Sequence, residues 1–120
     1  MGADLWTKNR SYRDSYNNSN LLWQFELDYW TWFNGKLTKA GNLTPKKALE
    51  VLDEMKAKEE VFAKNLKKLN AEEEGYFLGK YEEFKSFLNE AITSKKSIEC
   101  SIWPFLIRWL KLYEMYSLWW

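Results

Sequence analysis

The central part of the chain, residues 45–94, alternates apolar and charged residues with the spacing of amphipathic helices. In its first half, apolar side chains recur three, four or seven residues apart with charged side chains between them, namely Ala48, Leu52, Met55, Phe62, Leu66 and Leu69. A stripe of this kind buries one face of a helix and leaves the other face in water. The pattern therefore predicts surface helices that cover a second layer.

The boundaries of these central helices follow from capping residues. Thr44 is a suitable N-cap, and Pro45 suits the first helical position because its missing N–H would have no partner there. At Asn70 the charges change from basic to acidic, and Glu73 follows three residues later, as in a capping box. We therefore expect helices over 45–69 and 71–94, with one uninterrupted helix as the alternative.

The composition favours an all-α fold. Only two Val and four Ile occur, whereas helix-forming Leu, Ala, Lys and Glu are abundant. Two further helices are expected over 21–33, before Asn34-Gly35, and over 102–118. Residues 1–20 are expected to be irregular. One or two very short strands are expected in the chain, one near Leu5 and one over 98–102, before the last helix. The predicted architecture is a four-helix bundle-like single domain spanning 1–120.

Tryptophan is confined to the two ends of the chain. Of the eight tryptophans, four precede residue 34 and four follow residue 102, namely Trp6, Trp23, Trp30, Trp32, Trp103, Trp109, Trp119 and Trp120. This distribution predicts that the first and last helices pack together in a shared aromatic layer. Trp6, Trp119 and Trp120 are the hardest to bury in such a core, so we expect them to serve binding if any do.

Charge and targeting signals narrow the choice of partner. Eighteen basic and seventeen acidic residues give a net charge of +1 without a concentrated basic patch, which disfavours nucleic acid as a partner. The apolar C-terminal run contains Arg108, Lys111 and Glu114, which disfavours a membrane span. The N-terminus does not resemble a secretion leader, and Cys100 is the only cysteine. A cytoplasmic location is the expectation.

The residue inventory excludes several kinds of chemistry. No histidine is present, which removes the usual general base and zinc ligand, and one cysteine cannot form a thiolate cluster. No glycine-rich phosphate loop occurs. We therefore expect no enzyme activity, no metal and no cofactor. Glu26 and Asp28 on the apolar first helix must reach solvent or an arginine, and a structural ion pair is a better interpretation than a catalytic acid.

The segment from Arg10 to Asn20 is the best candidate recognition element. It contains two of the three arginines, two tyrosines and three asparagines, groups that bind phosphates, carboxylates or protein partners with defined geometry. A polar loop that only caps the first helix is the alternative. The candidate binding residues are Arg10, Tyr12, Arg13, Tyr16, Asn17, Trp6, Trp119 and Trp120.

One stretch of this segment resembles other sequences. The run Ser-Tyr-Arg-Asp-Ser-Tyr-Asn over 11–17, followed by Asn-Leu-Leu-Trp over 20–23, is similar to a segment of small uncharacterised proteins of bacteria and their phages. The resemblance implies a prokaryotic or phage origin and assigns no role to any residue.

Three functions are compatible with these observations. The first is a protein-binding module, such as a phage or bacterial inhibitor or adaptor, which could also form a homo-oligomer, because the chain has more aromatic surface than one small core needs. The second is a small-ligand binder for a nucleotide or sugar that stacks on Trp or Tyr. The third is peripheral membrane association through 102–118, which the winding polar stripe of that segment disfavours.

Overall fold

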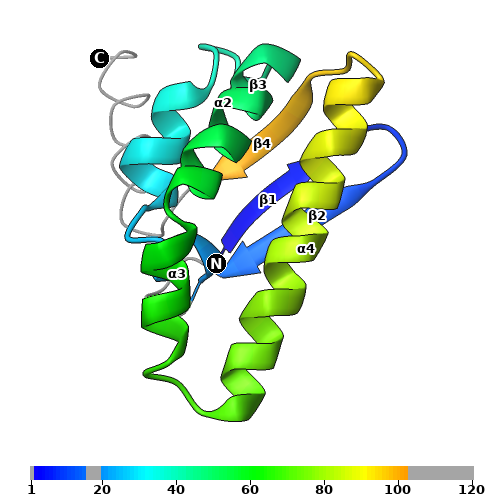
Figure 1. Cartoon of the computed structure of the whole chain (residues 1–120). Coiled ribbons are helices and arrows are strands. Elements are labelled where there is room, and N and C mark those ends of the chain that lie inside the picture. The colour runs from blue at the N-terminus through cyan, green and yellow to red at the C-terminus, as the bar shows by residue number, and fades with distance from the viewer. Residues whose placement is uncertain (1, 16–19, 103–120) are drawn as a thin grey trace, which may run out of the picture.

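The protein is a two-layer structure in which helices cover one face of a four-stranded antiparallel sheet (Figure 1). The computed structural model describes residues 2–15 and 20–102. The prediction of an all-α, four-helix bundle is therefore wrong, because both ends of the described chain form strands that pair with each other. The expected helix over 102–118 and its tryptophans lie outside the described residues, apart from residue 102, which ends a strand.

The sheet has the strand order β2-β1-β4-β3. The strands are β1 (Gly2–Trp6), β2 (Ser11–Ser15), β3 (Asn42–Leu43) and β4 (Ile98–Ile102). β1 forms a hairpin with β2 and also pairs with β4, so that Leu5 lies opposite Tyr12 on one side and Cys100 on the other. The expected very short strands near Leu5 and before residue 102 are thus full members of one sheet.

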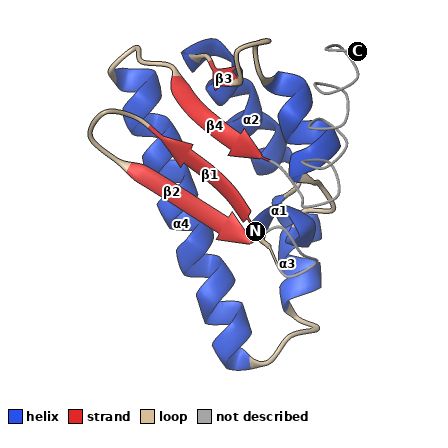
Figure 2. Cartoon of the chain, turned by 180° about the vertical axis from the view of Figure 1, so that it is seen from behind, coloured by secondary structure: helices blue, strands red, loops and turns tan. Residues whose placement is uncertain are grey.

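Helices and helical turns make up the second layer. They are α1 (Leu21–Gln24), the π-helical turn η1 (Tyr29–Phe33), the 3-10 turn η2 (Asn34–Lys36), α2 (Pro45–Ala57), α3 (Glu59–Leu66) and α4 (Ala71–Thr93). Viewed from behind, the sheet lies in front of α2 and α4 (Figure 2). α3 and the first half of α4 extend past the end of the sheet as a helical hairpin (Figure 1).

The predicted helix starts of the central segment are confirmed. The Thr44 side chain accepts a hydrogen bond from the backbone N–H of Lys47, and the Asn70 side chain accepts one from the N–H of Glu73. The expected helix over 45–69 is interrupted at Lys58, so the central segment forms three helices instead of two. The interruption lets α3 turn toward α1.

The expected helix over 21–33 is instead two short pieces, α1 and η1. Nearly every position of this stretch is apolar, so its sequence does not define one buried face. Two carboxylate-bearing residues, Glu26 and Asp28, lie between the pieces. The break therefore replaces one continuous helix with a short loop that carries the side chains of Glu26 and Asp28.

The core lies between the inner face of the sheet and the helices. Strand positions alternate, so Ala3, Leu5 and Tyr12 are buried, and the Tyr12 ring packs against Phe84 and Phe87 of α4. Phe25 stacks on Phe62 with ring centroids 4.2 Å apart, and this contact joins α1 to α3. The core is therefore one continuous cluster across both layers.

The opposite face of the sheet carries polar side chains and Trp6, and no described element crosses it (Figure 2). Trp6 and Trp23 are 38% and 48% exposed, whereas the Trp32 indole N–H donates to Glu54 of α2 at 3.1 Å. The described tryptophans therefore do not form one shared aromatic layer. In the described ranges, no helix is both long and apolar enough to cross a bilayer.

Candidate functional site

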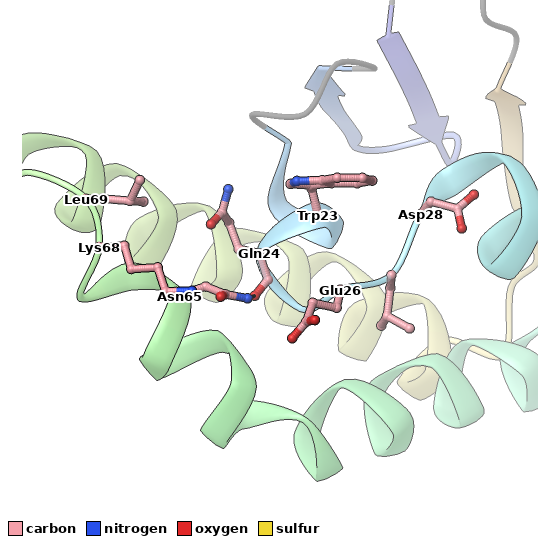
Figure 3. Close-up of a pocket in the computed structure, with 8 residues that line it drawn as sticks. Trp23, Gln24, Glu26, Asp28, Asn65, Lys68 and Leu69 are labelled. Carbon is pink, nitrogen blue, oxygen red and sulfur yellow. Dashed lines mark hydrogen bonds between the residues drawn. The ribbon is translucent and has the colours of Figure 1, made fainter.

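A groove of about 580 Å³ lies between the α1–η1 connection and the end of α3 (Figure 3). We call it the Trp23 groove, and its lining residues are Trp23, Gln24, Glu26, Leu27, Asp28, Asn65, Lys68 and Leu69. Its volume is within the range of small-ligand pockets, about 300–1,000 Å³. It combines one half-exposed indole with carboxylate, amide and ammonium groups.

Trp23 is positioned by the first turn of α1. The Asn20 side chain accepts a hydrogen bond from the Trp23 backbone N–H at 2.7 Å, which fixes this turn, as N-capping requires. Leu21 and Leu22 on the same short helix are fully buried, so the helix is anchored on its inner side. The indole is left on the outer side, where it faces the groove (Figure 3).

Glu26 occupies a backbone conformation that favours glycine. Its φ is +57°, and it is the first residue past the cap of α1. Its N–H donates to the carbonyl of Trp23 at 2.9 Å, and the Leu27 N–H donates to the carbonyl of Leu22 at 3.0 Å. This pair of bonds, with buried Leu22 and Leu27, is a Schellman motif, in which glycine is the usual residue at the position of Glu26. A glutamate here is strained, and such strain often accompanies function.

Asp28 ends the short loop and starts η1. Its carboxylate accepts hydrogen bonds from the backbone N–H and the hydroxyl of Thr31. π-Helical turns are rare and are often found at functional sites. The cap fixes the carboxylate of Asp28 at one end of the groove (Figure 3).

A buried carboxylate in the sheet fixes both ends of the segment over 21–29, which we call the Trp23 loop. Asp14 of β2 is only 3% exposed and accepts hydrogen bonds from the N–H groups of Ser15 and Leu21, at 2.8 and 3.0 Å. It also accepts one from the Tyr29 hydroxyl. Leu21 begins α1 and Tyr29 begins η1, so one side chain fixes the start and the end of the connection that carries Trp23, Glu26 and Asp28.

Burial controls the protonation of this cluster. Desolvation raises the pKa of Asp14 above its usual value, although its hydrogen bonds from Tyr29, Leu21 and Ser15 act in the opposite direction. Burial also raises the pKa of Tyr29 and of Tyr12. Both phenols therefore remain protonated at neutral pH, which keeps the Tyr29 hydroxyl a donor to Asp14.

The far wall of the Trp23 groove comes from the last turn of α3 and the residues after it. The Asn65 side chain donates a hydrogen bond to the backbone carbonyl of Gln24 at 2.9 Å, which joins the two walls. Lys68 and Leu69 continue this wall, and Lys68 is exposed. The two walls are therefore connected at their base, so the groove is a formed feature of the fold.

The candidate residues from the sequence are placed at three separate locations. Arg10 forms an ion pair with Glu90 at 2.8 Å and donates to Ser86 at 3.0 Å, both on α4. Tyr12 is buried on the inner face of β2. Trp6 and Arg13 lie on the outer face of the sheet. The remaining candidates, Tyr16, Asn17, Trp119 and Trp120, lie outside the described residues.

Trp6 and Arg13 share a second hollow of about 520 Å³ on the outer face of the sheet, with Asp4, Ser11 and Ser101 among its lining residues. Arg13 and Asp4 form an ion pair there at 3.4 Å. Because the two charges already neutralise each other, the hollow presents less unpaired charge than the Trp23 groove does. We therefore take the Trp23 groove as the candidate site.

Sequence reasoning partly missed this site. It identified Glu26 and Asp28 as carboxylates that must reach solvent or an arginine and preferred a structural ion pair, but Arg10 and Arg13 pair elsewhere. Arg108, the other arginine, lies outside the described residues. One signal in the sequence could have indicated this site. The apolar residues Leu22 and Leu27 lie on the two sides of a helix end, as is typical of a Schellman motif, and so indicate a helix that ends earlier than residue 33.

No group of three or more Cys, Asp or Glu side chains that could hold a metal ion occurs within 2–15 and 20–102. Burial raises the pKa of Cys100 to about 12, so its thiol is protonated and weakly nucleophilic at neutral pH.

Comparison with protein families, with curated proteins and with solved structures gives no match to this chain.

Proposed function

We propose that the protein is a non-enzymatic binding module that docks a partner protein at the Trp23 groove. The observation that carries the proposal is the half-exposed Trp23, held on a capped and anchored turn beside a formed groove. Tryptophan is among the residues most enriched at energetic hot spots of protein interfaces. A rigid, exposed indole beside fixed polar groups suits that use.

The rigidity of the loop supports the same proposal. The Asp14 hydrogen bonds, the Asn20 cap and the Asn65 bridge all fix the Trp23 loop before any partner arrives. A pre-organised site loses less conformational entropy on binding than a flexible loop would. The strain at Glu26 is also easier to explain if its carboxylate contacts a partner.

Photo-crosslinking tests for a partner at the Trp23 groove. A photo-crosslinking amino acid is placed at position 68, an exposed position that lines the groove and leaves the indole in place, and at position 6 as a control; the crosslinked partner is identified and purified. We expect crosslinking from position 68. Trp23→Ala should weaken binding of the purified partner about 30-fold, the size of a hot-spot loss of about 2 kcal/mol.

Trp6→Ala is the matched control, because Trp6 is also exposed but lies on the outer face of the sheet. Its effect on the dissociation constant should stay within about twofold, since it lies outside the proposed interface. Unchanged affinity in Trp23→Ala, or crosslinks from position 6 alone, would show that the partner binds elsewhere.

A small uncharged ligand such as a sugar is the second candidate. Gln24 and Asn65 place amide groups beside the indole, and a ring could stack on Trp23 while polar side chains orient it. A thermal-shift screen of sugars against the wild type and Trp23→Ala distinguishes the candidates. Stabilisation that disappears in Trp23→Ala would favour the small ligand.

A further inference from the structure

The Trp23 groove has more acidic than basic lining groups. Glu26 and Asp28 contribute two carboxylates, and Lys68 contributes one ammonium group. Neither carboxylate takes part in any ion pair that the described residues form. The last turn of α3 also ends at the groove, and the carboxyl end of a helix carries partial negative charge. The field in the groove therefore favours a cation.

The half-exposed Trp23 ring offers an aromatic surface for such a cation. Four other aromatic rings in this structure already have a cation at 4.2 to 6.0 Å from the ring centroid, namely Lys85 on Tyr81, Lys80 on Tyr12, Lys36 on Trp32 and Arg10 on Phe87. No described residue places a cation over Trp23, although indole is the strongest aromatic partner for one. Its half-exposed ring lies on the same side of the connection as Asp28, whereas the carboxylate of Glu26 points away from the ring (Figure 3), although all three residues line the groove.

From these observations, and resting on the proposed docking function, we infer that the Trp23 groove takes an arginine side chain of the partner protein. The planar guanidinium stacks on the indole, and Asp28 and Glu26, which line the same groove, supply the negative charge that attracts it. Arginine fits better than lysine because it can stack and donate a fork of hydrogen bonds at the same time. A phosphate-bearing ligand would be repelled by the same carboxylates.

The strained backbone of Glu26 agrees with this role. Glycine would fit the cap of α1 better, but it would remove the carboxylate closest to the indole in sequence. The short loop brings an aromatic face and a carboxylate together within four residues, from Trp23 to Glu26. The Schellman motif thus places an indole and a carboxylate among the lining residues of one groove.

The test is an NMR titration of the full-length ¹⁵N-labelled protein with N-acetyl-arginine amide. This probe carries the guanidinium without free backbone charges, as an arginine within a partner protein does. We expect saturable shifts of the Trp23 indole N–H and of the Glu26 and Asn65 backbone amides. The citrulline analogue has the same shape but no charge. Its affinity should be at least about tenfold lower, because charge-assisted hydrogen bonds are the stronger class.

Matched variants assign the effect to charge and stacking. Glu26→Gln keeps the shape of the side chain and should weaken arginine binding about fivefold, whereas Glu99→Gln, on the outer face of the sheet, should leave it unchanged. Trp23→Ala should abolish the saturable shifts, and Trp6→Ala should not. Raising the salt concentration from 0.05 to 0.5 M, about a threefold decrease in Debye length, should weaken binding.

Other probes separate failure of this inference from failure of the docking proposal. If the citrulline, glutamate or N-acetylglucosamine probe shifts the Trp23 signals as strongly as the arginine probe, the groove binds ligands but the arginine assignment is wrong. If spermidine binds more tightly than the arginine probe, the ligand is a small polycation and not a protein side chain. If no probe and no crosslinked partner affects Trp23, both proposals fail.

Discussion

At the scale of single residues, the backbone of Glu26 affects the stability of the fold, whereas its side chain is proposed to affect binding, so the two effects can be measured separately. A non-glycine residue at positive φ costs about 1 kcal/mol relative to glycine. Lys95 has φ +55° in the same kind of cap after α4, with the Lys96 N–H donating to the Ala91 carbonyl at 3.0 Å. The described residues therefore include two equivalent strained positions, Glu26 and Lys95, and of these Glu26 lies in the groove.

Both Glu26→Gly and Lys95→Gly should raise the free energy of unfolding by about 0.5–1 kcal/mol, because glycine adopts this conformation without steric cost. Only Glu26→Gly should weaken binding of the arginine probe. Urea unfolding and the NMR titration measure the two effects separately. A loss of stability in Glu26→Gly would mean that its side chain contributes to the fold.

Asp14 should titrate above the usual aspartate value of 3.8, because burial raises its pKa. Tyr29→Phe should raise the pKa of Asp14 further, since the hydrogen bond from Tyr29 lowers it. Carboxyl ¹³C NMR measures both titrations. Tyr76→Phe, which alters an exposed tyrosine on α4, is the control and should leave the Asp14 midpoint unchanged. An Asp14 midpoint below 3.8 would contradict the dominance of desolvation.

The sign of the stability change follows from the Asp14 titration. Between pH 3.8 and the folded-state pKa, the folded chain binds more protons at Asp14 than the unfolded chain does. The contribution of Asp14 to stability therefore falls as the pH rises through that window. Tyr29→Phe should extend the window to higher pH.

At the scale of elements, α4 contains glycines that its contacts do not require. A Cβ added at Gly75 or Gly79 would meet no atom within 4 Å, so these glycines do not serve a close helix–helix approach. At Gly41 the situation is different, because its φ is +84° in the turn before β3. Alanine at Gly79 and alanine at Gly41 should therefore change the stability of the protein in opposite directions.

Gly79→Ala should stabilise the protein by about 1 kcal/mol, the difference in helix propensity between the two residues. Gly41→Ala should destabilise it, because alanine at that φ is strained. Thermal denaturation of both variants tests this. Equal shifts of the two midpoints in the same direction would contradict it.

The local signals in the sequence predicted the central helices well and the strands poorly. Thr44 and Asn70 are caps whose partners lie three residues away, so the sequence itself contains the whole interaction. In β2 the inward positions are Tyr12 and Asp14, and the second is a charged residue that makes the strand look like a polar loop. The Asp14 carboxylate accepts hydrogen bonds from the Leu21 N–H and the Tyr29 hydroxyl, which lie seven and fifteen residues away. Its burial therefore could not be inferred from the residues next to it in the sequence.

At the scale of the whole molecule, the sheet joins the two ends of the described chain. β1 lies between β2 and β4, and Leu5 in its middle is fully buried opposite Cys100. Pairing between segments about 95 residues apart leaves no local periodicity to detect. The all-α prediction therefore failed where the structure depends on long-range contacts.

Leu5→Ala should lower the free energy of unfolding by about 2–5 kcal/mol, as expected for a buried leucine in a core. Leu49→Ala, at an exposed position of α2, should change it by less than about 0.5 kcal/mol. Chemical denaturation of the two variants measures the difference. Similar effects would indicate that the sheet is not the centre of the core.

The Asp14 carboxylate also makes the Trp23 groove dependent on the sheet. Asp14 is part of β2, which β1 holds in place, and β1 in turn pairs with β4 near the other end of the described chain. The groove should therefore form only when the whole domain folds. By linkage, a ligand bound at Trp23 should slow amide hydrogen exchange in β1 and β4, on strands that the ligand does not touch.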